Sequence, residues 1–308
     1  MSIHIKLSRS SQAFIGLMLL YVALTFILPV SNTATATYHL SDMQYRYLLL
    51  IVKLPLIAAW SITFYSYRRL RAYAAQIKDT AEGEDFGQIS RGVAWLAWGF
   101  AVPAVISSFL GVIANSHPSF QTLSSLFSSY FYLVVTLAAF SYIAAGIHKL
   151  SERSNIHLES KHIRYLILML VAIGVLFCSL IAGRLHGHRL GDAYNSFYVP
   201  NILVWTTIVI PYLYAWFMGL FGALELILVA RRTTGVIYRQ ALRYLAVGLV
   251  IIIISMSGLQ YFRAIIPRNG HVTINGALLM VYGIYAATAI GSVLLAIGVK
   301  RLKRIEDI

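Results

Sequence analysis

The feature that most constrains this chain is a series of long apolar segments separated by short polar ones. Roughly 20 apolar residues in a helix cross the hydrocarbon core of a bilayer, so such segments predict membrane-spanning helices. Eight segments qualify, at 12–30, 44–66, 92–114, 124–147, 164–183, 200–229, 241–262 and 276–298. Because only 12% of the 308 residues are charged and 59% are hydrophobic, no sizeable soluble domain remains. The sequence therefore predicts an all-α, polytopic bundle of eight transmembrane helices.

The basic residues predict the orientation of this bundle. The chain carries 25 Lys and Arg against 11 Asp and Glu, for a formal net charge of +14. Nineteen of the 25 precede the first span, follow the last one, or lie in alternate connections. The positive-inside rule then places the N- and C-termini in the cytoplasm, in a cytoplasmic membrane of the bacterial type. This orientation accounts for the net positive charge. We therefore expect the lipid bilayer as a partner and do not expect nucleic acid.

The N-terminal segment has a second interpretation. Lys6 and Arg9, the apolar run 14–28 and the small residues 34–36 are typical of a cleavable signal peptide. Cleavage would leave seven spans and an external N-terminus. The first span has a counterpart in the second half of the chain, however, and we therefore expect eight retained spans.

The chain shows an internal repeat of four spans. Three pairs of similar segments occur in the same order, at offsets between 149 and 156 residues: 54–60 with 210–216, 95–99 with 244–248, and 146–150 with 298–302. An even number of spans gives both copies the same orientation. We therefore expect two four-helix units, residues 1–150 and 151–308, related by a pseudo-twofold axis along the membrane normal.

Lys53 carries the charge that lies deepest in a predicted span. A charged side chain within a bilayer costs a few kcal/mol on insertion scales, so its default interpretation is functional. Arg46, Lys53 and Trp60 follow one another at intervals of seven residues and share a helical face. We expect this face, with Trp216 at the matching place in the other half, to bind an anionic lipid or a small anionic solute. The structural alternative is that Lys53 snorkels outward or bonds carbonyls freed by Pro55.

The acidic residues offer few partners to these cations. Eight of the eleven fall in predicted cytoplasmic segments, while Asp42 and Asp192 lie on the outer side. Glu225 lies toward the inner end of the sixth span, a few residues before Arg231 and Arg232, and we expect it to pair near that interface. The middle of the predicted membrane therefore has no carboxylate, which argues against a proton- or sodium-coupled transporter.

A second candidate site lies on the predicted outer face. Its histidines and carboxylates form two similar sets along the chain: His39, Asp42, His117, His186, His188, Asp192 and His271. Imidazole and carboxylate are ligands for zinc or copper. Protonation of the same histidines would instead report external pH. The simplest alternative is that they are ordinary polar residues of loops.

The sequence contains no common enzyme motif, and we lean against an enzyme. A phosphate-binding Walker loop, GxSxG, HExxH and an Asp-rich prenyl-diphosphate motif are all absent. In length, four-plus-four duplication and outer histidines, the chain resembles the haem A synthases in architecture. Their Glu-x-x-His-Arg motif is missing, since residues 44–47 read Gln-Tyr-Arg-Tyr. The resemblance therefore carries over no site, and we expect no haem.

Two functional classes remain open from the sequence. The first is a permease or a lipid- or solute-handling protein that binds an anionic group at the Arg46–Lys53–Trp60 face. The second is a membrane sensor or accessory subunit, whose outer His and Asp residues read metal or pH. In this second class the basic cytoplasmic segments contact a membrane or cytoplasmic protein partner. The longest of these segments, 68–91, is expected to be a solvated loop.

Overall fold

The computed structural model describes residues 8–28, 41–116, 118–154, 210–265 and 274–303. This part of the chain is all-α, with seven helices and no strand: α1 (Arg9–Ile27), α3 (Asp42–Gln76), α4 (Ala81–Ser116), α5 (Pro118–Arg153), α9 (Ile210–Arg232), α10 (Val236–Ile265) and α11 (Ile274–Lys303). Each helix contains a stretch that is long and apolar enough to cross a bilayer. The chain is therefore a multi-pass integral membrane protein, as the sequence predicts.

Seven of the eight predicted spans coincide with these helices. The fifth span, 164–183, and the start of the sixth, 200–209, lie outside the described residues. The count of eight spans, the two-unit division and the cytoplasmic termini stay predictions. The helical membrane bundle itself is confirmed.

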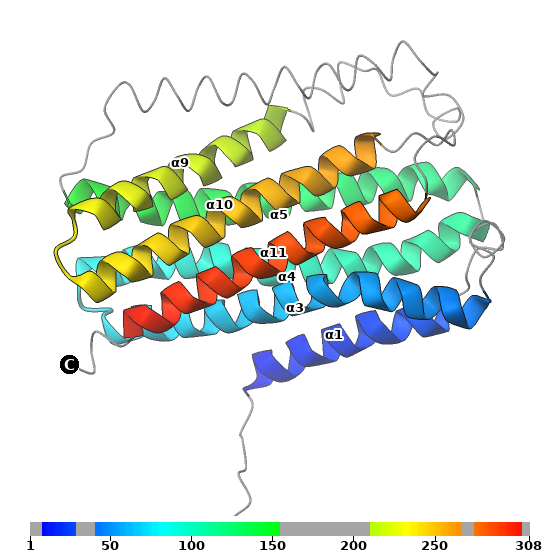
Figure 1. The fold of residues 1–308 in the computed structure, drawn as a ribbon, viewed down its shortest axis with the longest axis horizontal. Coiled ribbons are helices and arrows are strands. Elements are labelled where there is room, and N and C mark those ends of the chain that lie inside the picture. The colour runs from blue at the N-terminus through cyan, green and yellow to red at the C-terminus, as the bar shows by residue number, and fades with distance from the viewer. Residues whose placement is uncertain (1–7, 29–40, 117, 155–209, 266–273, 304–308) are drawn as a thin grey trace, which may run out of the picture.

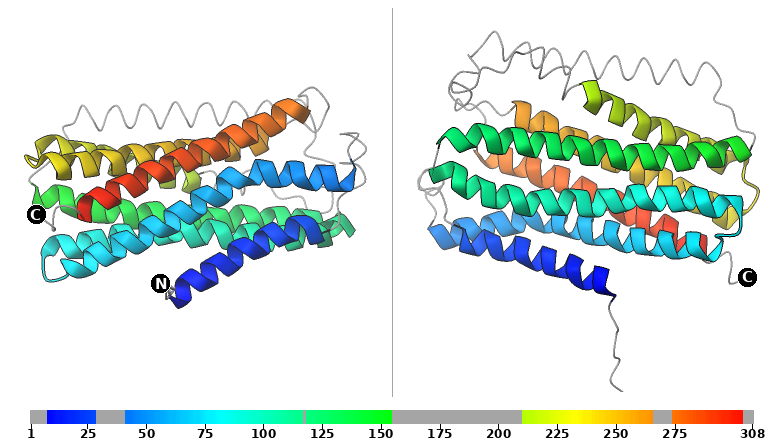
Figure 2. Two further views of the ribbon diagram at one scale, coloured as in Figure 1. Left: turned by 60° about the horizontal axis from the view of Figure 1, so that its bottom comes forward. Right: turned by 180° about the vertical axis from the view of Figure 1, so that it is seen from behind.

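Six of the helices form a closed ring of neighbours. Going around it, α3 packs on α4, α4 on α5, α5 on α9, α9 on α10, α10 on α11, and α11 again on α3. Figure 1 shows α10 and α11 in front of α4 and α5, and the view from behind in Figure 2 reverses that order. Helix α1 lies outside the ring against α3 and α4. Side chains from opposite sides of the ring therefore face a common interior.

Small residues bring two pairs of helices into close contact. A Cβ atom added to Gly92 of α4 would lie 2.5 Å from the carbonyl oxygen of Ala139 in α5. One added to Gly248 of α10 would lie 2.7 Å from the carbonyl oxygen of Gly291 in α11. In a membrane, where lipid is as apolar as the core, such backbone approach is a main source of helix association.

Segment 68–91 is not a loop, and that expectation was wrong. Helix α3 continues to Gln76 and α4 begins at Ala81, so only four residues connect them. Leu70 and Phe86 on these extensions are fully buried. The loop was expected because the segment is rich in charged residues. Its apolar residues nevertheless recur at helical spacing and pack between the helices. At 35 and 36 residues, α3 and α4 are about 50 Å long, well beyond a hydrocarbon core of about 30 Å.

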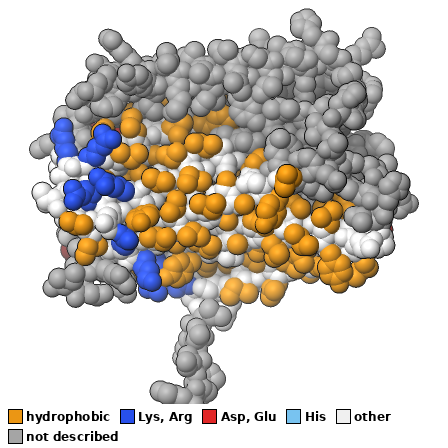
Figure 3. All heavy atoms as spheres, viewed as in Figure 1, with side chains coloured by type: hydrophobic (Ala, Val, Ile, Leu, Met, Phe, Trp, Pro, Cys, Tyr) orange, Lys and Arg blue, Asp and Glu red, His pale blue; other side chains and the backbone are white. Residues whose placement is uncertain are grey.

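Basic side chains gather at one end of the bundle. In Figure 3 Lys and Arg lie where α10 begins and α11 ends, and hydrophobic side chains cover most of the rest of the described surface on this face. We name this the basic end; α4 and α10 begin there, and α3, α5, α9 and α11 end there (Figure 1). The apolar band beside it is the surface expected to face lipid.

Candidate binding cavity

A cavity of 230 Å³ lies inside the bundle, between α1, α3, α4, α5, α9 and α11. It is lined by Lys53 and Trp60 of α3 and by Trp216 of α9, which the sequence predicted to belong to one site. Tyr21 of α1 and Tyr285 of α11 also line it. Residues from both halves of the chain therefore meet at one internal space.

Lys53 points toward α1 and the cavity. Its Nζ donates a hydrogen bond to the hydroxyl of Thr25 at 3.2 Å and lies 4.8 Å from the centroid of the Tyr21 ring. A cation over an aromatic face is attracted by about 0.5–2 kcal/mol, which offsets part of the desolvation of the ammonium. An ammonium has three N–H donors, and within the described residues only the bond to Thr25 is formed. The described part of the chain therefore leaves two of its donors without a partner.

Aromatic rings form the apolar walls of the cavity. Trp60 is 5% exposed and meets the Tyr21 ring edge-on, with centroids 5.4 Å apart. Trp216 is equally buried, and its ring lies 6.5 Å from that of Tyr212, which also lines the cavity. Such walls suit an apolar or aromatic body, while the polar group of a ligand reaches the amine.

Three hydroxyl groups of the cavity donate their hydrogens within the protein. Ser108 and Thr136 each donate to a carbonyl of their own helix, at 2.8 and 2.7 Å. Thr288 donates in the same way and also lies 2.9 Å from the hydroxyl of Ser255. No Asp or Glu is among the described residues that line the cavity. Lys53 is therefore its one ionic group in the described part of the chain.

Arg46 is not among the residues that line the cavity, and its predicted part in ligand binding stays a prediction. Its Nη1 donates to the carbonyl oxygens of Thr25 at 3.1 Å and of Leu28 at 2.9 Å, and also to that of Phe26. These carbonyls end α1, where backbone acceptors lack partners within the helix. A cation at this place also complements the helix dipole. The face of α3 that carries Arg46, Lys53 and Trp60 thus contacts α1.

The predicted metal site falls almost wholly outside the described residues. Asp42 is exposed in the first turn of α3, next to a capping box formed by Ser41 and Gln44. Six of its predicted partners lie outside the described ranges: His39, His117, His186, His188, Asp192 and His271. Where the structure describes the chain, no group of three His, Cys, Asp or Glu is suited to a metal ion. The sensor alternative stays a prediction.

Tyrosines of the cavity were missed by sequence reasoning. Tyr21, Tyr132, Tyr212 and Tyr285 all line it. Tyrosine is common at membrane interfaces, so spacing alone does not separate an inward ring from one in an aromatic belt. The available signal was the match of 54–60 with 210–216, which places Tyr212 one turn before Trp216.

A buried carboxylate at the basic end links α5 to α9. Glu225 is 3% exposed, and its Oε1 lies 2.9 Å from Nδ1 of His148. Glu225 thus pairs at this end of α9, as expected, and its partner is His148 of the neighbouring helix. Arg231 and Arg232 lie six and seven positions farther along the same helix, beyond the three or four that bring side chains together.

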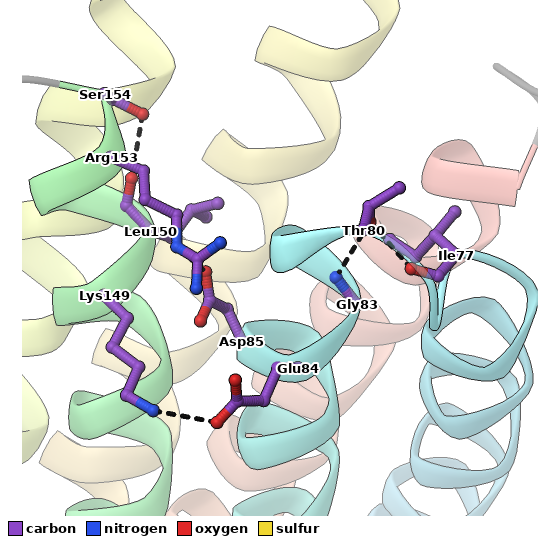
Figure 4. Close-up of polar contacts among 9 residues, drawn as sticks. All are labelled: Ile77, Thr80, Gly83, Glu84, Asp85, Lys149, Leu150, Arg153 and Ser154. Atoms are coloured by element: carbon purple, nitrogen blue, oxygen red, sulfur yellow. Dashed lines mark hydrogen bonds and ion pairs between the residues drawn. The ribbon is translucent and has the colours of Figure 1, made fainter.

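A second buried carboxylate links α4 to α5 in the same region. Figure 4 shows Arg153 extending toward Asp85, with Nε 3.1 Å from Oδ2. The Asp85 side chain is fully buried, whereas Arg153 is 37% exposed. A neighbouring pair between Lys149 and Glu84, at 3.0 Å, is open to solvent on both sides. None of the residues in these ion pairs lines the cavity.

No model of a known protein family matches this chain, and no curated protein or solved structure matches it either. The geometry of the cavity is therefore the basis for a functional assignment.

Proposed function

We propose that this membrane protein is a permease or lipid- or solute-handling protein that binds a small anionic group in the cavity of Lys53, Trp60 and Trp216. One observation carries the proposal. The ammonium of Lys53 borders an internal cavity, and among the described residues it has two N–H donors without a partner and no carboxylate in the lining. Intramembrane charges of this kind usually mark a substrate or ion site.

The chemistry of the lining supports an anion with an apolar body. An ammonium forms charge-assisted hydrogen bonds with carboxylate or phosphate oxygens, about twice as strong as neutral ones. The rings of Trp60 and Trp216 provide apolar surface on either side. A volume of 230 Å³ is below the usual range of about 300–1,000 Å³ for ligand pockets. The ligand that suits it best is a short-chain carboxylate or the head of a larger anionic lipid.

The position of the cavity supports movement of the ligand, beyond static binding. Helices from both halves of the chain enclose it, with α3 and α9 each supplying a buried tryptophan. In transporters built from repeated halves, a site between the halves opens alternately as one half rocks against the other. We expect α1 to move with α3, because Tyr21 and Thr25 both contact Lys53.

The two-unit organisation, residues 1–150 and 151–308, is part of this proposal. Its strongest support is a set of matching close contacts. In the first half, Gly92 of α4 lies against Ala139 and Ile143 of α5. In the second half, Gly248 of α10 lies against Gly291 and Leu295 of α11. The glycines are 156 residues apart in the sequence, and each contacted residue is 152 residues from its counterpart. A tandem duplication with parallel orientation accounts for this equivalence.

Further contacts follow the same offsets. Gly146 packs against Ile89 on α4, and Gly298 packs against Leu245 on α10. These offsets favour Gly92 as the counterpart of Gly248, so the sequence match of 95–99 with 244–248 is out of register by seven residues. Seven residues are close to two helical turns, so both alignments place apolar residues on the same face.

Binding is tested by thermal stabilisation of the purified protein. We expect short-chain carboxylates or anionic lipids to raise the unfolding midpoint of wild type and to lose this effect in Lys53→Met, which keeps the stem and removes the charge. Lys300→Met, at the exposed end of α11, is the matched control and should respond like wild type. If no anion distinguishes Lys53→Met from the control, the proposal fails. Uptake of the stabilising anion into proteoliposomes then distinguishes a permease from a binding protein.

The proposed orientation is tested by cysteine labelling in intact cells. In a Cys178→Ser background, a cysteine at Met43 should react with an impermeant reagent and a cysteine at Gln240 should not. The reverse pattern would place the basic end outside.

A further inference from the structure

A groove of 910 Å³ runs along the outside of α3 and α4 from the basic end into the apolar band. It is separate from the cavity of Lys53 and shares no lining residue with it. Three cations line its outer part, and three aromatic residues line its deeper part: Arg71, Lys78, Arg91, Trp95, Trp98 and Phe131. The groove therefore changes from cationic to apolar along its length.

The cations at its mouth are exposed and leave an excess of positive charge. Arg71 donates to the hydroxyl of Tyr67 at 2.9 Å, which holds its guanidinium beside the groove. Glu84 is the one acidic residue in the lining, and it forms an ion pair with Lys149 of α5. Within the described ranges, Arg71, Lys78 and Arg91 form no ion pair with a carboxylate.

The deeper part of the groove is built for a hydrocarbon chain. Trp95 is 40% exposed, and Trp98 is held edge-on by Phe14 and Phe64 at centroid distances of 5.0 and 5.6 Å. From Ala94 to Val102, the apolar lining extends about 12 Å along α4 at 1.5 Å per residue. This length takes up a large part of one acyl chain in a leaflet of about 15 Å.

We propose that this groove binds an anionic phospholipid of the leaflet at the basic end. Guanidinium groups bind phosphate oxygens in bidentate fashion, so Arg71 and Arg91 hold the phosphate while Lys78 adds charge. Gln88 also lines the groove, and its Oε1 atom is buried without a hydrogen-bond partner among the described residues. An acyl chain lies against Trp95 and Trp98.

The first test compares lipids and charge-removing variants in nanodiscs. We expect phosphatidylglycerol to raise the unfolding midpoint of wild type above its value in phosphatidylcholine by several degrees. The Arg71→Gln/Arg91→Gln double variant should lose most of this gain. Arg231→Gln/Arg243→Gln removes two exposed cations of the same end outside the groove and should keep the gain. Soluble glycerol phosphate should not substitute for the lipid, because it has no chain to occupy the apolar part.

Equal loss in both double variants would mean general attraction of the basic end to anionic lipid and would overturn the site. Full stabilisation by glycerol phosphate would mean a free-phosphate site and would overturn the lipid assignment. If the Arg71→Gln/Arg91→Gln variant does not fold, the proposal is tested on the wild-type protein by crosslinking. A phosphatidylglycerol with a photoreactive acyl chain should then crosslink within 95–102, and crosslinks confined to other helices would refute the proposal. None of these outcomes depends on ligand binding at Lys53.

Discussion

His148 of α5 and Glu225 of α9 join the first half of the chain to the second through a contact of 2.9 Å between Nδ1 and Oε1. The same imidazole lies 3.3 Å from Glu152 through its other nitrogen. One carboxylate is buried and the other is 60% exposed, so a single histidine bridges an interior group and a solvated one. The energetic contribution of the two contacts should differ accordingly.

Removal of the imidazole should therefore destabilise the protein through Glu225. In His148→Ala the buried carboxylate has no described partner, and we expect the free energy of unfolding to fall by about 1–3 kcal/mol. Adding Glu225→Leu should restore most of the loss, because the unpaired charge is replaced by apolar volume. Glu152→Ala should change stability by less than about 1 kcal/mol. Denaturant titration in micelles measures all three, and similar losses in His148→Ala and Glu152→Ala would contradict the assignment.

The two ion pairs between α4 and α5 form a second matched comparison. Arg153→Ala leaves the fully buried Asp85 uncompensated, and we expect a loss of about 2–4 kcal/mol, less than for a fully enclosed pair because Arg153 is partly solvated. Lys149→Ala removes only a contact to Glu84, which is 65% exposed, and should cost at most about 1 kcal/mol. Thermal unfolding of both variants in one detergent tests the order. A larger effect of Lys149→Ala would show that burial does not control these pairs.

The close contacts of glycine predict where a single methyl group is tolerated. Gly92→Ala and Gly248→Ala force the methyl to within 3 Å of facing backbone, and each should lower stability by about 1–3 kcal/mol or more. A methyl on Gly16 or Gly283 meets nothing within 4 Å, so alanine there should be neutral or stabilise the helix by up to about 1 kcal/mol. Unfolding midpoints of the four variants provide the comparison. Equal behaviour of the two sets would rule out the tight helix pairing.

Arg46 should act on α1 alone. Its loss in Arg46→Ala frees the carbonyls of Thr25 and Leu28, so hydrogen exchange should increase in the last turn of α1. The midpoint of global unfolding should change little, since the six-helix ring does not include α1. Arg243→Ala, which is exposed on α10, is the control and should leave exchange in α1 unchanged. Unaltered exchange in Arg46→Ala would mean that the arginine does not cap α1.

Much of the candidate site followed from sequence because the membrane simplifies the inference. A lone lysine in an apolar span is conspicuous, and Trp60 and Trp216 occupy matching places in two similar segments. Helical spacing then places Lys53 and Trp60 on one face. Arg46 shares that spacing, yet it bonds the end of α1. Periodicity identifies which residues share a face and leaves open which neighbour that face meets.

By itself the sequence determined that this protein lies in a membrane, that its long apolar segments are helices, and that its basic residues gather at one end. A bilayer offers no hydrogen bonds to the backbone, so a long apolar segment has to form a helix. The tertiary structure decided which helices touch: Tyr21 beside Lys53, His148 beside Glu225, and Arg153 beside Asp85. In lipid every apolar face is equally satisfied, so the partners depend on close fit between particular backbones and side chains. Spacing along one helix does not encode that fit.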